Sequence, residues 1–202
     1  MLGNLFGHFL DKPLSSMAKK IPFAPNTITA AGFILTILAS FILSQSLFWG
    51  GVMILFSGLF DMLDGIVART NNKSTQFGAF IDSVLDRYSD SFLFLGLAWY
   101  FFNAESISGS SLSLVTSESI TGVSLSIMTM IGALLVSYTR ARAEGLGKEC
   151  KVGLMERPER ILLMAFGALT GWILPVMWIM LVLTHLTVLH RIYHVWKSME
   201  KR

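Results

Sequence analysis

Asp61-Met-Leu-Asp64-Gly65 and Asp82-Ser-Val-Leu-Asp86 place four carboxylates in sequence that is otherwise apolar enough to cross a membrane. An ionised Asp at bilayer depth costs about 2.5–3.5 kcal/mol on insertion scales, so four of them need compensation. Asp61 and Asp64 are three residues apart, and Asp82 and Asp86 are four apart. Each pair therefore shares one face of a helix. The pattern predicts two helices that each present two acids on one side.

The polar segment Thr70-Asn-Asn-Lys-Ser-Thr75 predicts a short connection that folds these two helices into an antiparallel pair. Asp61 and Asp82 lie about equally far from Asn72, and at about 1.5 Å per residue they reach nearly the same depth. Acids that converge there repel one another unless a divalent cation lies between them. All-oxygen ligation suits Mg²⁺ or Mn²⁺, and so many carboxylates favour a site for two ions.

The composition is that of a polytopic membrane protein. The 202 residues are 53% hydrophobic and only 14% charged, and the mean hydropathy is +0.61, which a soluble domain with one apolar helix does not reach. The only cysteine, Cys150, excludes an internal disulfide framework. Nucleic-acid binding is not expected, because the basic residues lie beside membrane segments and form no separate basic face.

Residues 1–21 predict an amphipathic helix in the membrane interface, bent at Pro13. We expect no signal peptide there, since no apolar region precedes a small-residue cleavage site. We expect residues 1–202 to form a single membrane domain that includes this helix, with Asn26 or Thr27 as the cap of the first spanning helix. The fold class expected is therefore all-α integral membrane, with six transmembrane helices between about 27 and 195. They lie at roughly 27–48, 50–70, 75–102, 123–143, 159–171 and 173–195.

The positions of the charges predict the orientation. All sixteen Lys and Arg fall in the N-terminal arm, the second-to-third turn, the fourth-to-fifth loop, the C-terminal tail or at Arg87. The three opposite loops contain none. The positive-inside rule therefore places both termini and the aspartates on the cytoplasmic face of the cell membrane.

The acidic stretch also contains a spaced pattern, D-x2-D-G-x2-A-R-x8-G-x3-D-x3-D, which resembles the signature of the CDP-alcohol phosphotransferase family. The resemblance implies transfer of a phosphatidyl-type group from a CDP-linked lipid to an alcohol, with release of CMP. It implies that Asp61, Asp64 and Asp82 hold the metals. Asp86 would be both a ligand and the catalytic base for the acceptor hydroxyl. The pattern is filled by Asp61, Asp64, Gly65, Ala68, Arg69, Gly78, Asp82 and Asp86.

The same resemblance places the nucleotide against the second and third helices. Gly65 and Ala68 let a bulky ligand approach closely, and Arg69 offers a planar fork to phosphate. Taken singly, these residues are equally explained by helix packing and by a snorkelling arginine. The CDP-lipid contacts expected are Asn26, Thr29, Gly65, Ala68, Arg69, Thr75 and Gly78.

A second informative stretch brings four arginines to the ends of the fourth and fifth helices. Lipid head-group contacts and positive-inside topology are one explanation. A phosphate site is the other, because arginines bind a phosphomonoester through paired hydrogen bonds. The run R-A-R-A-E-G…G-L-x-E-R-P-E-R resembles family members that make phosphatidylinositol phosphate or its archaeal ether-lipid counterpart. The acceptor-phosphate residues expected are Arg140, Arg142, Arg157 and Arg160.

Two alternatives remain open at this stage. Glycerol 3-phosphate also carries a phosphate, so it competes with inositol phosphate as the acceptor. The second alternative is not an enzyme but a small metal or ion transporter that would use the acids as its pathway. Acids that lie toward one face of the membrane favour the enzyme. The sequence does not separate diacylglycerol from archaeol lipids or Mg²⁺ from Mn²⁺. The resemblance suggests a homodimer among membrane lipids.

Overall fold

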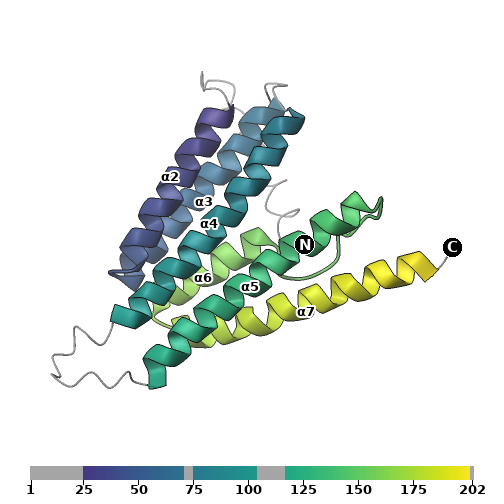
Figure 1. The fold of residues 1–202 in the computed structure, drawn as a ribbon. Helices are drawn as coiled ribbons and strands as arrows, with labels where there is room; N and C mark the ends of the chain where they lie inside the picture. Colours follow the sequence, from purple (N-terminus) through teal and green to yellow (C-terminus); the bar gives the residue numbers. More distant parts are fainter. Residues whose placement is uncertain (1–24, 71–74, 104–116, 201–202) are drawn as a thin grey trace.

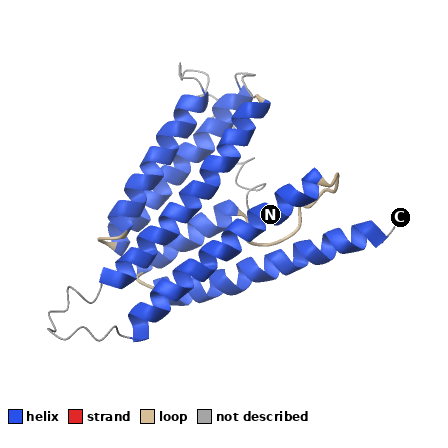
Figure 2. Ribbon diagram, viewed as in Figure 1, coloured by secondary structure: helices blue, strands red, loops and turns tan. Residues whose placement is uncertain are grey.

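The computed structural model describes residues 25–70, 75–103 and 117–200, and all of their side chains except those of 25–26, 62–70 and 117. The predicted interfacial helix at 1–21 lies outside the described residues. The described part is helical and contains no strand (Figure 2). Its helices are α2 (Pro25–Leu43), α3 (Leu47–Thr70), α4 (Gln76–Asn103), α5 (Ser117–Gly145), α6 (Arg157–Thr170) and α7 (Ile173–Glu200).

Helix ends follow local side-chain chemistry. The first helix stops before the predicted residue 48, because polar residues follow Leu43 and the Ser44 hydroxyl donates to the carbonyl of Phe41 at 2.7 Å. Helix α6 has Pro158 in its first turn and ends at Gly171, whose φ of 77° is left-handed. Helix α5 extends beyond its predicted apolar core of 123–143 at both ends, and α7 continues past its predicted end at residue 195 to Glu200.

The six helices pack in a closed order, α2–α3–α6–α7–α5–α4, with α4 returning to α2 (Figure 1). Close approach is possible where a small residue faces a neighbouring helix. A Cβ on Gly96 of α4 would collide with the backbone of Ser40 of α2. On the other side, a Cβ on Gly132 of α5 would collide with Thr184 of α7.

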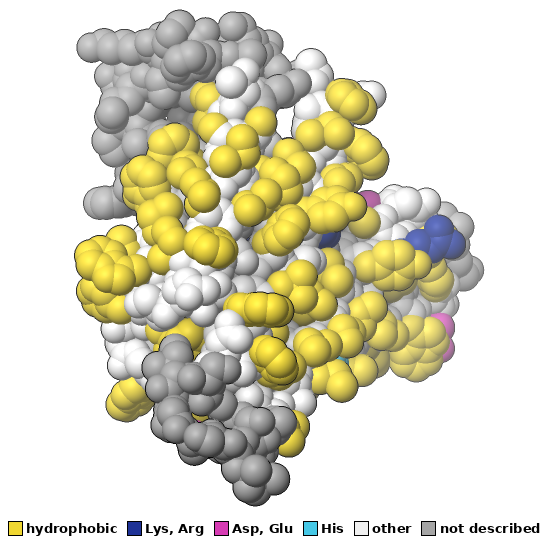
Figure 3. Space-filling view, turned by 60° about the vertical axis from the view of Figure 1, so that its left-hand side comes forward, with side chains coloured by type: hydrophobic (Ala, Val, Ile, Leu, Met, Phe, Trp, Pro, Cys, Tyr) yellow, Lys and Arg dark blue, Asp and Glu magenta, His cyan; other side chains and the backbone are white. Residues whose placement is uncertain are grey.

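The described helices have the apolar character of a membrane protein. Glu118–Gly145 and Ile173–Glu200 are long and apolar enough to cross a membrane, and Thr27–Leu43 and Leu47–Asp61 are shorter apolar helices. Hydrophobic side chains cover most of the face seen in Figure 3. The total of six crossings stays a prediction, because α6 has only 14 residues and α4 carries charged residues along its first half.

Candidate functional site

Three of the predicted aspartates meet between α3 and α4. Asp61, Asp82 and Asp86 each offer a carboxylate oxygen, and these oxygens lie within 4.8 Å of one another. All three residues are half-buried. Asp64 lies three residues after Asp61 on α3, where the backbone is described and its side chain is not. The described oxygens form a hard donor set of the kind that Mg²⁺ and Mn²⁺ prefer.

The first turn of α4 sets the position of two of these acids. Thr75 caps the helix, since its Oγ1 accepts a hydrogen bond of 2.9 Å from the backbone N–H of Gly78. Asp82 and Asp86 then follow one turn apart, on the same face of the helix. The Thr75 hydroxyl, which we expected to contact the nucleotide, therefore has a structural role as well.

Arg157, at the start of α6, points into the carboxylate cluster. Its Nη1 forms ion pairs with Asp61 and with Asp86. Its Nε is 3.6 Å from an oxygen of Asp90, too long for a hydrogen bond, and this buried nitrogen has no hydrogen-bond partner in the described part of the chain. Among the described side chains, Asp61, Asp86 and Asp90 share two ion-pair partners, Arg157 and Arg160. Three acids around two guanidinium groups leave room for the charge of a divalent cation.

Asp90 has a defined partner that its position in the sequence did not identify. It forms an ion pair with Arg160 of α6, and the two side chains are only 8% and 3% exposed. Arg160 also donates from Nη1 to the backbone carbonyl of Met155 at 3.0 Å. Asp90 lies one turn beyond Asp86, and this spacing predicts that the two side chains share a face of α4. The spacing does not predict that Arg160 is the partner.

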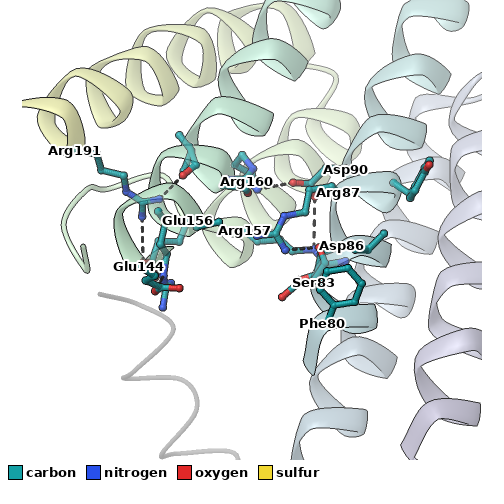
Figure 4. Close-up of a pocket in the computed structure, with 16 residues that line it drawn as sticks. Phe80, Ser83, Asp86, Arg87, Asp90, Glu144, Glu156, Arg157, Arg160 and Arg191 are labelled. Atoms are coloured by element: carbon teal, nitrogen blue, oxygen red, sulfur yellow. Dashed lines mark hydrogen bonds and ion pairs between the residues drawn. The ribbon is translucent and has the colours of Figure 1, made fainter. Parts of the chain in front are cut away.

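A cavity of about 660 Å³ opens beside the carboxylates (Figure 4). Asp86 and Asp90 lie on its α4 side, and α5, α6 and α7 supply arginines on the other sides. Its charged lining combines three of the four predicted arginines with two that were not predicted, Arg87 and Arg191. The charged residues that line it are Asp86, Arg87, Asp90, Arg140, Glu144, Glu156, Arg157, Arg160 and Arg191.

The predicted arginines are not equivalent in the structure. Arg140 lines the cavity, where it pairs with Glu144 at 3.0 Å and with Glu156 at 3.7 Å. Arg142 is exposed and is not part of the cavity lining. Two residues advance a helix by about 200°, so Arg140 and Arg142 face opposite sides of α5. The structure therefore brings Arg140, Arg157 and Arg160 together and leaves Arg142 outside.

Sequence reasoning missed Arg191, which lies in α7 and is 2% exposed. Its Nε donates to the carbonyl of Val152 at 2.8 Å, its Nη1 donates to the carbonyl of Val136, and its Nη2 is 3.7 Å from Glu156. Arg191 thus joins α5, α7 and the loop before α6. In the sequence Arg191 was counted with the basic C-terminal tail. The apolar residues around it in the last predicted helix were the signal that could have indicated burial.

The expected nucleotide contacts are partly described. Thr29 is half-buried on α2, one turn before Gly32, where a Cβ would lie 3.8 Å from the backbone nitrogen of Asp61. The start of α2 is therefore level with the acids. The residues whose side chains are not described are Asn26, Gly65, Ala68 and Arg69.

Comparison with known proteins adds a family and close relatives. The sequence profile described as CDP-alcohol phosphatidyltransferase matches residues 23–190. The chain is 34% identical to the phosphatidylinositol phosphate synthase of Mycobacteroides abscessus over 195 residues, which cover 92% of this chain and 83% of the relative. It is 32% identical to the archaetidylinositol phosphate synthase of Methanothermobacter thermautotrophicus over 204 residues, which cover 98% and 95%.

The fold is also that of a solved enzyme. The crystal structure of Mycobacterium tuberculosis phosphatidylinositol phosphate synthase with CDP-DAG bound matches with a TM-score of 0.75 at 28% identity, covering 92% of this chain and 93% of that one. The structure of the same synthase in complex with manganese and citrate matches with a TM-score of 0.76 at 28% identity, covering 92% and 88%.

Proposed function

The chain belongs to the CDP-alcohol phosphatidyltransferase family, and on this basis we propose that it transfers a phosphatidyl-type group from a CDP-linked lipid to a hydroxyl of inositol phosphate, releasing CMP. The observation that carries the proposal is one cavity in which Asp86 faces Arg140, Arg157 and Arg160. A reactive carboxylate and a phosphate-binding surface are what a phosphorylated alcohol acceptor requires. The relatives named as phosphatidylinositol phosphate and archaetidylinositol phosphate synthases support the choice of acceptor.

The four aspartates of the signature, Asp61, Asp64, Asp82 and Asp86, would hold two Mg²⁺ or Mn²⁺ ions. The three described carboxylates, with oxygens within 4.8 Å, support this assignment, as does the manganese complex of the related synthase. When bound, the ions supply positive charge to the pyrophosphate and to the departing CMP oxygen.

Asp86 would take the proton from the acceptor hydroxyl. It is the one member of the described carboxylate cluster that also lines the cavity, and its side chain is 25% exposed. The freed acceptor oxygen then forms a bond to the lipid-side phosphorus, and the bond from that phosphorus to the CMP oxygen breaks. A carboxylate within reach of a bound hydroxyl suits this role of general base.

The CDP-lipid would lie against the ends of α2, α3 and α4. Thr29, Thr75 and Gly78 occupy the described part of this surface, and the level of α2 beside Asp61 supports the assignment. The CDP-DAG complex of the related synthase supports a CDP-lipid as the donor. The full proposed set is Asn26, Thr29, Gly65, Ala68, Arg69, Thr75 and Gly78.

The phosphate of the acceptor would be bound by Arg140, Arg157 and Arg160. Arg191 would stabilise this side of the cavity through its hydrogen bonds to the backbone of Val136 and Val152. Guanidinium groups recognise a phosphate and not the ring attached to it. Glycerol 3-phosphate therefore remains the second candidate acceptor, because it would use the same arginines.

Topology and assembly complete the proposal. A single membrane domain would cross the cell membrane six times after an interfacial helix at 1–21, with both termini and the active site facing the cytoplasm. The placement of all sixteen Lys and Arg residues supports this orientation. A homodimer is proposed from the family resemblance.

CMP release by the purified protein in detergent tests the function. The reaction would contain CDP-diacylglycerol or CDP-archaeol, Mg²⁺ or Mn²⁺, and one of four acceptors: inositol phosphate, glycerol 3-phosphate, inositol or serine. We expect CMP with inositol phosphate, little with the unphosphorylated alcohols, and none after EDTA treatment. Faster release with glycerol 3-phosphate would select the second acceptor, and no CMP with any acceptor would contradict the proposed function.

A further inference from the structure

Arg157 belongs to two sites at once. Its Nη1 contacts Asp61 and Asp86, which are two of the three clustered carboxylates. The same side chain lines the cavity that would hold the acceptor. Within the described part of the chain, the ion pairs of Arg140, Arg160 and Arg191 are with other acids, namely Glu144, Glu156 and Asp90. Among these four arginines, Arg157 is therefore the one whose ion pairs a cation at the carboxylates would meet.

A guanidinium and a divalent cation compete for the same oxygens here. Oδ2 of Asp61 and Oδ1 of Asp86 both contact Nη1, and a metal shared by these two residues would take carboxylate oxygens of the same pair as ligands. Two positive charges in direct contact with the same carboxylate oxygens repel each other strongly in a half-buried site. Metal binding at the cluster thus requires the guanidinium to move away.

A place for the displaced guanidinium already exists. Asp90 lies one turn further along α4, with its carboxylate 3.6 Å from the Nε of Arg157. The cavity of about 660 Å³ borders both residues. A guanidinium that leaves Asp61 and Asp86 keeps a negative neighbour at Asp90 and turns its Nη1 and Nη2 donors toward the cavity, where a phosphate would lie.

We propose that Arg157 couples the metal site to the acceptor site, because a divalent cation displaces its guanidinium from Asp61 and Asp86 and so presents it to the acceptor's phosphate. This inference rests on the proposed function. The coupling works in both directions, since an effect of one ligand on the affinity for another is reciprocal at equilibrium. Inositol phosphate that captures Arg157 removes a competing charge from the carboxylates and strengthens metal binding.

Mn²⁺ titration of the purified protein in detergent, followed through the EPR signal of the free ion, tests this coupling without any turnover. In the wild-type protein, saturating inositol phosphate should lower the Kd for Mn²⁺ by about fivefold or more, the lower end of usual couplings between sites. In Arg157→Met the Kd measured without inositol phosphate should already be lower by a similar factor, and inositol phosphate should have no further effect.

Arg140→Met is the matched control. Arg140 lines the same cavity but contacts Glu144 and Glu156 and none of the clustered aspartates. Its loss should weaken the response to inositol phosphate while the Kd for Mn²⁺ without inositol phosphate stays within about twofold of the wild-type value. Inositol phosphate also chelates some Mn²⁺ in solution. This effect is the same for every variant, so the differences in Kd between the variants do not contain it.

Asp82→Asn separates a failure of the coupling from a failure of the metal site. Loss of Mn²⁺ binding in Asp82→Asn with a wild-type Kd in Arg157→Met would overturn the coupling and leave the proposed function in place. Unchanged Mn²⁺ binding in Asp82→Asn would overturn the metal site itself. If Arg157→Met does not fold, the wild-type titration decides the matter: a Kd that inositol phosphate leaves unchanged contradicts the inference.

Discussion

Asp90 of α4 and Arg160 of α6 form an ion pair in which both side chains are buried, at 8% and 3% exposure. The two residues are 70 positions apart in the chain, and the pair fastens the helix that carries two cavity arginines to the helix that carries two of the clustered aspartates. Removing one partner from a buried pair leaves an uncompensated charge, which costs about 3–5 kcal/mol. The pair therefore contributes both to the stability of the helix bundle and to the relative position of the aspartates and the arginines in the site.

Asp90→Ala should lower the free energy of unfolding by about 3–5 kcal/mol, because Arg160 then stays buried without its partner. Unfolding in detergent, followed by tryptophan fluorescence, measures the change. The double variant Asp90→Leu/Arg160→Met replaces both charges with apolar side chains, and it should recover most of the lost stability while acceptor use stays impaired. Wild-type stability in Asp90→Ala would show that the pair does not hold α4 to α6.

Asp86→Asn should abolish CMP release while the protein still binds CDP-lipid. The amide keeps the size of the side chain but does not accept a proton at neutral pH, so the acceptor hydroxyl stays protonated. Equilibrium binding of a labelled CDP-lipid, measured beside the CMP assay, separates the two effects. Turnover at the wild-type rate would remove Asp86 from its proposed role.

Arg140→Ala should raise the KM for inositol phosphate by about tenfold or more, since a hydrogen bond to a charged group is worth about 1.5–3 kcal/mol. The KM for the CDP-lipid should change little. Arg142→Ala is the control, because Arg142 is exposed on the opposite side of α5 and outside the cavity. Equal increases in the two variants would mean that the four arginines act through their general charge and not through a defined phosphate site.

Gly96→Ala should destabilise the fold by about 1–3 kcal/mol, the usual cost of overpacking. The added methyl group would collide with the carbonyl of Ser40 where α2 and α4 touch. Gly145→Ala offers a comparison at the end of α5, where a Cβ meets nothing within 4 Å. Thermal unfolding of both variants in the same detergent gives the difference, and similar midpoints would argue against a close α2–α4 contact.

Much of the architecture could be predicted from local sequence patterns. Apolar runs separated by polar or Pro/Gly segments give the order of the helices, and the three- and four-residue spacings of the aspartates give their common faces. The convergence of Asp61 with Asp82 and Asp86 followed from their nearly equal distances along the chain to the predicted connection around Asn72. These features depend on neighbours along the chain, so a single sequence contains them.

The partners of the charged residues could not be predicted in the same way. Arg157 meets Asp61 because α6 packs against α3 at a particular rotation about its axis. The same rotation turns Arg160 of α6 toward Asp90 of α4. A sequence contains the helical period but not the rotation between helices far apart in the chain. Arg142 was included with Arg140 for this reason, and Arg191 was overlooked because its burial depends on α5 and on the loop before α6.

The 70 positions between Asp90 and Arg160 also have a consequence for biogenesis. A ribosome adds about 5–20 residues per second, so α3 and α4 are synthesised several seconds before the arginines of α6 that pair with their acids. During that interval the acids of α3 and α4 have only water or free cations to compensate their charge. The arrival of α6 then supplies these partners, and α7 completes the closed order of helices afterwards. A chain that stalls before α6 would leave the acids of α3 and α4 without these arginines.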